Sequence, residues 1–439
     1  MLLIYLPVIT PRSDYIFEFI FNQQLGMGFR TTADAHAFIN YPGEKINYSG
    51  HRFNAEFFIK ASPLLAEDSI KKIVIPIEEC NEIKILFPNN DNCDMGFDIF
   101  SATFYMLSRY EEYLPFIPDQ YGRFDVTGSI AYKNNFLQMP VVDKWMEQFK
   151  IILNKSFPEL TCKAAKFTAL VTYDIDVAYK FKGRGFVRNT GSTIKDLLRF
   201  DFKNIFGRTQ TLNNKNKDPW DTYDYLEKII AKNNLQSVFF FLLGDHSMHD
   251  RNLDYKTAVM KTLVNKIKAF SEIGIHPSFT SSIFPKKITI EKERLEKISG
   301  APITKSRQHF LKFILPSTYN TLVDNGIKED YSMVFPYEAG FRAGTSNPFY
   351  FYDLKKEKTT SLKIFPVTLM EGNFMNDKNL PKEKVMENIV NLINAVKNVN
   401  GTFISIWHNH TVSETKEYQD WKKIHDQMIQ KIVTISVDP

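Results

Sequence analysis

Apolar runs alternate with helix-like patterns along the second half of the chain, from about residue 167 onward. Short runs of apolar and β-branched residues predict buried strands, whereas apolar residues three and four positions apart predict helices. The predicted strands cover residues 168–173, 237–243, 273–276, 306–310, 331–335, 363–369 and 402–407. One predicted helix begins at Pro219, with Asp218 as its cap. Two others cover residues 255–271 and 382–400.

Strand and helix in repeated succession indicate parallel strands joined by crossover helices. Seven strands of this kind suit a closed or nearly closed barrel. We therefore predict an α/β fold, a distorted (β/α)7-type barrel, over residues 161–439. In such barrels the chemistry gathers at the C-terminal ends of the strands. Residues that follow the predicted strands are therefore the first candidates for a site.

Residues 1–160 follow a different pattern, in which short elements succeed one another without regular alternation. An apolar start interrupted by two prolines predicts a strand and a turn. Further along, the pattern predicts a helix through residue 21 capped by Ser13, a helix over 97–114 capped by Asp98, and a helix over 141–157. We predict a smaller N-terminal α+β domain here, with its boundary near Thr161 and no catalytic constellation.

Three charged residues near the middle of this domain, Arg109, Glu111 and Glu112, are a possible exception. Adjacent charges on one helix are more often a solvated face or a domain contact than a site. We therefore expect one of those two roles for them.

Length and composition narrow the class of protein. A chain of 439 residues exceeds the size at which one core usually stops growing, which favours two domains. Its 44% hydrophobic and 24% charged residues are ordinary for a globular protein. The three cysteines are widely spaced and support neither a disulfide framework nor a cysteine metal site. No signal-peptide pattern and no apolar run long enough for a transmembrane segment is present, so a cytoplasmic location is expected.

Positive charge is concentrated in residues 180–217, which contain ten basic and two acidic residues. This segment therefore carries a net charge of +8, whereas the whole chain carries +5 and the remainder −3. One hypothesis is a lid or channel for an anionic partner at the mouth of the barrel; the alternative is a solvated loop. No recognised nucleic-acid-binding motif accompanies the charge, so no nucleic acid partner is expected.

The candidate chemistry begins with Asp174 and Asp176 in the sequence TYDIDVAY, at the end of the first predicted strand. Two carboxylates at positions i and i+2 of a strand point the same way, and like charges so close require a proton or a cation between them. Alternatively, the pair caps the following loop. Other polar residues at strand ends favour a site, namely His276, Arg307, His309, His408 and His410.

These residues resemble the motifs of the NodB-homology polysaccharide deacetylases. The resemblance covers about residues 165–435. It implies a catalytic-base aspartate, Asp174, and a metal-binding aspartate, Asp176, in the D-x-D form of the first motif. It further implies a metal-binding histidine, His276 in IGIHPSFTS, an arginine that orients the base, Arg307 in SRQHFLKF, and a histidine on the leaving-group side, His408 in SIWHNH.

Two departures from the family pattern change the expected ligand set. Thr280 stands where the family has a second metal-binding histidine, and Val177 follows Asp176 in place of glycine. We expect His309 to replace the missing ligand, with His410 in reserve. The sequences RQHFL and GFRAGT are similar to those of an atypical branch of the family, which adds Arg342 to the substrate-binding candidates together with His410 and Thr280.

The resemblance implies metal-dependent hydrolysis of acetyl groups, N- or O-linked, from an acetylated glycan or another sugar-containing substrate. The divalent metal expected is zinc, held by Asp176, His276 and His309. Two alternatives stay open: a non-catalytic protein that binds a glycan or a partner, and a hydrolase of another C–N bond such as an amide or a cyclic ureide.

Overall fold

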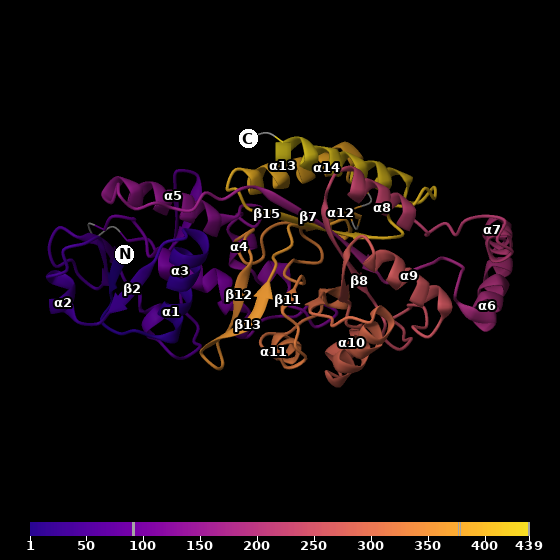
Figure 1. The fold of residues 1–439 in the computed structure, drawn as a ribbon, viewed down its shortest axis with the longest axis horizontal. Coiled ribbons are helices and arrows are strands. Elements are labelled where there is room, and N and C mark those ends of the chain that lie inside the picture. Colours follow the sequence, from indigo (N-terminus) through magenta and orange to yellow (C-terminus); the bar gives the residue numbers. More distant parts are fainter. Residues whose placement is uncertain (90–92, 376, 378, 438–439) are drawn as a thin grey trace.

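The computed structural model describes residues 1–89, 93–375, 377 and 379–437. Its N-terminal part contains a parallel four-stranded sheet in the order β2-β1-β3-β4 (Figure 1). The strands are β1 (Leu2–Tyr5), β2 (Phe29–Thr32), β3 (Lys45–Ser49) and β4 (Phe57–Lys60). The hairpin β5 (Ile77–Cys80) and β6 (Ile83–Leu86) and the helices α1 (Pro11–Phe17), α2 (Ala35–Ile39), α3 (Ile99–Leu107), α4 (Ile130–Lys133) and α5 (Val141–Ser156) complete this part.

Helix α1 begins earlier than the sequence predicts. Thr10, not Ser13, is its N-cap: the Thr10 hydroxyl accepts a 3.1 Å hydrogen bond from the Ser13 backbone N–H. Pro11 occupies the first helical position, where its fixed φ angle suits a helix and its missing N–H costs nothing. The predicted cap of α3 is confirmed, because the Asp98 carboxylate accepts a 3.0 Å bond from Ser101 N–H.

The second part is built on a nine-stranded sheet in the order β12-β13-β11-β10-β9-β8-β7-β15-β14. All neighbouring pairs are parallel except β12 with β13. The strands are β7 (Thr168–Ile175), β8 (Gln236–Phe241), β9 (Glu272–Ile275), β10 (Lys305–Ser306), β11 (Glu329–Asp330), β12 (Phe349–Asp353), β13 (Lys358–Ile364), β14 (Leu369–Met370) and β15 (Thr402–His408). The predicted α/β class is thus confirmed.

The predicted seven-stranded barrel differs from the observed ladder, which has nine strands and two separate ends in the described chain. The end strand β14 and β13, which neighbours the other end strand β12, nevertheless belong to one extended run, because only residues 365–368 separate them. Within that link, Phe365 N–H donates to the Asp330 carbonyl (2.9 Å) and Thr368 N–H donates to the Ile404 carbonyl (2.8 Å). The sheet therefore curls until one short segment reaches both of its sides.

Three predicted strands are wrong in extent. The strand predicted over 363–369 covers the last two residues of β13, the link 365–368 and the first residue of β14. The strand predicted over 306–310 ends at Ser306, because Phe310 and Leu311 have φ angles of 60° and 51°, which no strand contains. The structure has no strand over 331–335; the nearest strand is β11, which is two residues long and ends at Asp330. It ends there because the Asp330 carboxylate accepts a 2.9 Å hydrogen bond from the Ser332 N–H.

Helices cover the outside of the curled sheet in Figure 1. They are α8 (Tyr223–Lys232), α9 (Ala258–Lys268), α10 (Lys286–Ser299), α11 (Ser317–Asp324), α13 (Lys382–Lys397) and α14 (Gln419–Val437). The short helix α12 (Gly372–Met375) follows β14 at the strand ends. Helix α8 begins four residues after the predicted start at Pro219. Asp218 does not cap it, because its carboxylate accepts the backbone N–H groups of Lys180 and Phe181, each at 2.8 Å. No helix of the described residues is both long and apolar enough to cross a bilayer.

Alternation along β7 places its side chains in two different cores. Val171, Tyr173 and Ile175 pack in the large core. Leu170 faces the opposite way, into a small cluster with Val238, Phe240, Ile404 and Ile406. Thr172 and Asp174 share the parity of Leu170, so the inner face of the strand carries Asp174 directly above this cluster.

Polar contacts and shared core tie the two parts of the chain together. Buried Arg12 pairs with Glu357 at 2.6 Å, and Arg342 pairs with Glu112 at 2.7 Å. One continuous hydrophobic core contains residues from both parts. Glu112 therefore makes the domain contact that was one of the two roles expected for the Arg109, Glu111 and Glu112 group. The division at residue 160 itself stays a prediction.

Candidate metal centre

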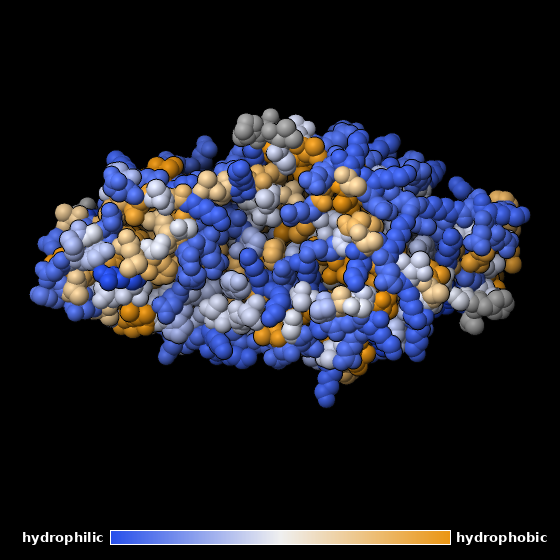
Figure 2. Space-filling model, in the orientation of Figure 1, coloured by the Kyte–Doolittle hydropathy of each residue, from blue (hydrophilic) through white to orange (hydrophobic). Residues whose placement is uncertain are grey.

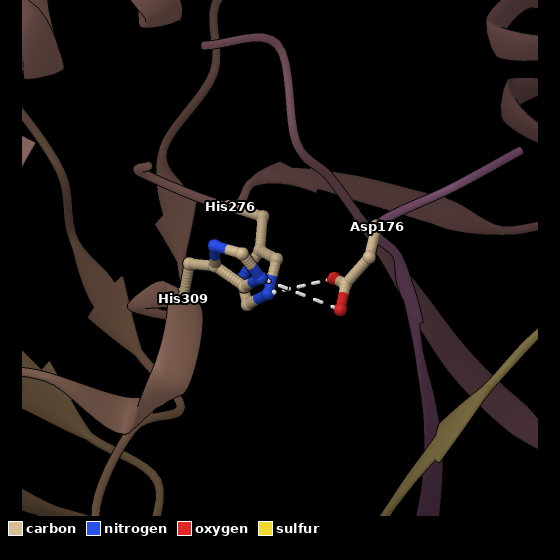
Figure 3. A group of neighbouring side chains, drawn as sticks. All are labelled: Asp176, His276 and His309. Atoms are coloured by element: carbon tan, nitrogen blue, oxygen red, sulfur yellow. Dashed lines mark ion pairs between the residues drawn. The ribbon is translucent and has the colours of Figure 1, made fainter. Parts of the chain in front are cut away.

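Two imidazole side chains from segments far apart in the sequence converge on one carboxylate. The Nε2 atom of His276 lies 3.2 Å from Asp176 Oδ1, and the Nε2 atom of His309 lies 3.4 Å from Asp176 Oδ2. Figure 3 shows both rings pointing at the carboxylate. One candidate ligand atom from each of the three residues lies within 4.8 Å of the others. The structure thus brings together the three residues that the sequence suggested as ligands.

Strand ends deliver each of these groups. Asp176 follows β7 and His276 follows β9, while His309 lies in the turn after β10. His408 ends β15, whose register places it opposite Asp174 of β7. Because β9, β8, β7 and β15 are consecutive parallel neighbours, their C-terminal ends lie along one edge.

Each imidazole is oriented by a hydrogen bond at its other nitrogen. The Nδ1 atom of His276 lies 2.5 Å from the Arg307 carbonyl oxygen. The Nδ1 atom of His309 lies 3.0 Å from Asp250 Oδ1, and that of His408 lies 2.7 Å from Glu371 Oε1. An acceptor at Nδ1 keeps the proton there and leaves the Nε2 lone pair facing Asp176, as metal-binding histidines require.

Asp250 is a site residue that the sequence did not reveal. It is fully buried and lies in a loop after β8 with no strand-end or periodic signal. Besides the bond to His309, it accepts bonds from Phe279 N–H (2.7 Å) and from the Thr280 hydroxyl (2.8 Å). Thr280 therefore supports Asp250 and does not line the cavity, which corrects its prediction as a substrate-binding residue.

Glu371 was also missed, although a signal for it exists in the sequence. It stands two residues after the predicted strand 363–369, and Asp174 became a candidate because it too follows a predicted strand. Its buried carboxylate accepts bonds from both the backbone N–H (2.8 Å) and the ring of His408, and from the Thr411 hydroxyl (2.9 Å).

Asp174 and Arg307 form a buried pair beside the three converging residues. Nη1 of Arg307 donates to Asp174 Oδ1 at 2.8 Å, and Nη2 donates to the Thr172 hydroxyl at 2.7 Å. The guanidinium also lies over the Phe240 ring at 4.4 Å and has no exposed surface. Asp174 Oδ2 lies 3.7 Å from His276 Nε2, so one oxygen is held by arginine and the other faces the site.

Electrostatic interactions lower the pKa of Asp176 and raise the pKa values of His309 and His408. Burial alone would raise the pKa of Asp176, but the neighbouring charges of His309 and His408 hold it well below its usual value. Burial would lower the pKa of His309, but Asp176 and Asp250 raise it to about 9. Burial likewise opposes protonation of His408, whose pKa Glu371 and Asp176 raise well above its usual value. The centre therefore concentrates negative charge that attracts protons or a cation.

A cavity of about 340 Å³ opens onto these residues. Asp174, Asp176, His276, His309 and His408 line it, together with Phe310, Leu311 and Tyr337 on the sheet side. Tyr121 and Arg123 also line it and come from the N-terminal part of the chain. Residues before the proposed boundary therefore form one wall of the candidate site.

Two predicted substrate-binding residues lie away from this cavity. Arg342 is buried, donates to both carboxylate oxygens of Glu112 and lies over the rings of Phe313 and Phe335. His410 packs against Trp220 and Tyr418, with ring centroids 5.1 and 5.3 Å apart. Neither is among the described residues that line the cavity. Arg342 is thus a contact between the two parts of the chain, which corrects its predicted role.

The donor set fits a divalent cation such as zinc. Zinc is commonly bound by imidazole nitrogens and carboxylate oxygens, three protein ligands leaving one position open. Asp176 Oδ1 is buried and has no hydrogen-bond partner among the described residues, although it faces His276. A buried carboxylate oxygen without a donor is costly unless a cation takes that place.

The chain was compared with known proteins. Residues 2–158 match the model of a family of unknown function (DUF7033). Comparison with curated proteins finds no match. The solved structures it resembles include a candidate polysaccharide deacetylase from Mycobacterium smegmatis, at 14% identity and a TM-score of 0.40 over 63% of this chain and 86% of that one.

Two further deacetylases resemble the chain at comparable sequence identity. A polysaccharide deacetylase from Bacillus cereus is 10% identical, with a TM-score of 0.30 over 61% of this chain and 85% of that one. A chitin deacetylase from Colletotrichum lindemuthianum is 15% identical, with a TM-score of 0.31 over 62% and 85%.

Proposed function

We propose that the protein is a metal-dependent hydrolase that removes N- or O-linked acetyl groups from a carbohydrate or sugar-containing substrate. The observation that carries this proposal is the convergence of His276 and His309 on Asp176, beside the Asp174–Arg307 pair, at the floor of one cavity. Metal-assisted hydrolysis of an acyl group uses a set of metal ligands and a separate, oriented carboxylate that accepts a proton.

Asp176, His276 and His309 would hold the metal. A bound divalent ion supplies a polarised carbonyl and a water with a pKa near neutral. Asp174 accepts the proton of the attacking water through the oxygen that faces the cavity. Arg307 fixes the position of Asp174 by donating a 2.8 Å hydrogen bond to Oδ1.

His408 serves on the leaving-group side in this proposal. Its Nε2 atom faces the site, 3.5 Å from Asp176 Oδ2, and the neighbouring carboxylates of Glu371 and Asp176 raise its pKa well above the usual value. A protonated imidazole can donate to the departing amine or alkoxide. Glu371 at Nδ1 stabilises that charged form.

The N-terminal part would restrict access to the site. Tyr121 and Arg123 form one wall of the cavity, so a substrate must contact residues on both sides of position 160. We assign residues 1–160 to an N-terminal domain with this role, although its four-stranded sheet is parallel and therefore differs from the α+β arrangement expected. We assign residues 161–439 to a deacetylase-like domain.

Metal loading and acetate release test the proposal together. The protein is freed of metal with a chelator and reloaded with Zn²⁺; one equivalent per chain is expected, and His309→Ala should lose it. Acetate release from N-acetylated chito-oligosaccharide and O-acetylated xylan is then followed. Asp174→Asn should retain the metal but lose roughly 10² to 10⁴ of the rate.

Three outcomes contradict the proposal in different ways. Failure to bind metal at micromolar concentration removes the hydrolase and leaves a glycan- or partner-binding protein. Metal binding with release of ammonia instead of acetate, on a panel of amides and cyclic ureides, indicates a hydrolase of another C–N bond. A fully active Asp174→Asn variant removes the proposed base.

A further inference from the structure

Helices α6 (Gly185–Leu198) and α7 (Phe202–Leu212) form a hairpin after β7. In Figure 1 they lie at the right-hand end, away from the nine-stranded sheet. A short turn at residues 199–201 joins them. They make up most of the segment 180–217, whose net charge is +8.

The interior of this hairpin is polar. Arg208 is 5% exposed and donates to Asp196 (2.6 Å) and to the Thr193 hydroxyl (2.7 Å). Asn204 donates to the same Asp196 oxygen at 2.8 Å. The contact between the two helices is thus made by an ion pair and its hydrogen bonds, not by their apolar side chains.

Most of the apolar side chains described in the hairpin are exposed instead. Six of them are between 53% and 79% exposed: Ile194, Leu197, Leu198, Phe200, Phe202 and Phe206. Figure 2 shows hydrophobic residues among hydrophilic ones at this end of the molecule. Helices in a globular protein normally bury such positions, so this arrangement is inverted relative to an ordinary helical hairpin.

Basic residues accompany the exposed apolar ones. Lys195, Arg199 and Lys203 are exposed and lie within the same stretch as the exposed phenylalanines. Aromatic and aliphatic side chains next to lysine and arginine are the features of helices that lie in the interface of an anionic membrane. There the apolar groups enter the headgroup boundary and the cations meet lipid phosphates.

We propose that the α6–α7 hairpin docks the protein on an anionic membrane surface. The charge favours this occupant over a second copy of the chain, because residues 185–212 contain five basic and two acidic residues, and pairing two hairpins would bring together two units that each carry a net charge of +3. The hairpin follows β7, the strand whose C-terminal end carries Asp174 and leads to Asp176. The proposal does not depend on the reaction that the site performs.

Sedimentation with vesicles tests the proposal on the full chain. Vesicles of phosphatidylcholine alone are compared with an equimolar mixture of phosphatidylcholine and phosphatidylglycerol. The protein should sediment with the mixed vesicles, more weakly as salt increases, and should bind phosphatidylcholine alone at least about tenfold less.

Three variants separate the contributions. Phe200→Ser/Phe202→Ser/Phe206→Ser and Lys195→Gln/Arg199→Gln/Lys203→Gln should each weaken binding by roughly tenfold or more. Val74→Ser/Ile117→Ser/Ile151→Ser, which changes residues 91%, 87% and 68% exposed outside the hairpin, should bind as the unaltered protein does. Circular dichroism checks that each variant folds.

Several results would overturn the proposal. Equal sedimentation with both kinds of vesicle excludes an anionic surface, and unchanged binding of the phenylalanine variant excludes the hairpin. A dimer in solution that the phenylalanine variant abolishes, without lipid binding, identifies a second copy as the occupant. Failure of deacetylase activity has no bearing on any of these measurements.

Discussion

Nη1 of Arg123 donates a 2.6 Å hydrogen bond to the carbonyl oxygen of Phe310. This bond links the N-terminal part of the chain to the turn that carries His309. Phe310 and Leu311 both have positive φ angles, a conformation that costs bulky residues of order 1–3 kcal/mol each and persists only when its surroundings enforce it. Asp119 and the rings of Tyr121 and Tyr337 hold the guanidinium in place.

Arg123→Gln should therefore weaken metal binding by about tenfold, because the turn that carries His309 loses the hydrogen bond from the Arg123 guanidinium. Competition with a chromogenic chelator measures the affinity for Zn²⁺. Arg30→Gln is the matched control, since Arg30 is exposed on β2 of the N-terminal sheet. Equal affinities of the two variants would show that the turn keeps its shape without Arg123.

The sequence predicts the converging residues better than it predicts their supports. Asp174, Asp176, His276 and His408 stand where parallel strands end, and strand position is visible in the apolar pattern. Asp250 and Arg123 come from loops whose path depends on contacts with the rest of the fold. No periodic pattern marks such residues, so only the three-dimensional arrangement reveals them.

The errors at Arg342 and at the predicted strands have a common cause. Local sequence does not distinguish an arginine that faces a cavity from one that faces a carboxylate of another part of the chain, here Glu112. Likewise, the apolar run after Ser306 looks like a strand, but the backbone turns at Phe310 and its ring enters an aromatic cluster with Tyr121 and Phe279. Tertiary contacts decided both cases.

Asp250→Asn should lower the affinity for Zn²⁺ by about 10- to 100-fold, the usual effect of removing a carboxylate that orients a metal-binding histidine. The substitution leaves the His309 Nδ1 without its charged acceptor. Chelator competition measures the change, with Asp254→Asn as control because Asp254 is exposed in the same loop. A loss as large in the control would point to disturbance of the loop.

Glu371→Gln should reduce kcat by at least about tenfold while the metal content stays at one per chain. The amide retains an acceptor for His408 but lacks the negative charge that favours its protonated form. Steady-state acetate release and metal analysis on the same sample measure both quantities. Glu414→Gln, in the exposed loop after β15, should change neither. A drop in metal content with Glu371→Gln would make His408 a ligand.

Arg342→Ala should destabilise the fold by about 3–5 kcal/mol, because it leaves Glu112 buried with one of its two arginine partners missing. Urea unfolding measures the free energy, and Glu112→Gln/Arg342→Met should recover part of it. The affinity for Zn²⁺ of the folded variant should be unchanged. A raised KM with unchanged stability would instead restore Arg342 as a substrate-binding residue.

His425 of α14 should make stability depend on pH between about 4 and 6.5. Its ring is fully buried, with Nε2 2.9 Å from the Tyr173 hydroxyl and Nδ1 3.0 Å from the Tyr225 hydroxyl. Burial lowers its pKa to about 4, whereas the unfolded chain has the ordinary value near 6.5. Between these values the unfolded state binds more protons, so the free energy of unfolding falls as pH falls through this window.

Urea unfolding at about pH 7.5 and pH 5 measures this contribution. His309 and His408, whose pKa values are raised, contribute with the opposite sign, so the informative quantity is the difference between the unaltered protein and His425→Gln. From the higher to the lower pH, the unaltered protein should lose about 2 kcal/mol more than the variant. Equal losses would mean that His425 takes up its proton without unfolding, through rearrangement of the two tyrosine hydroxyls.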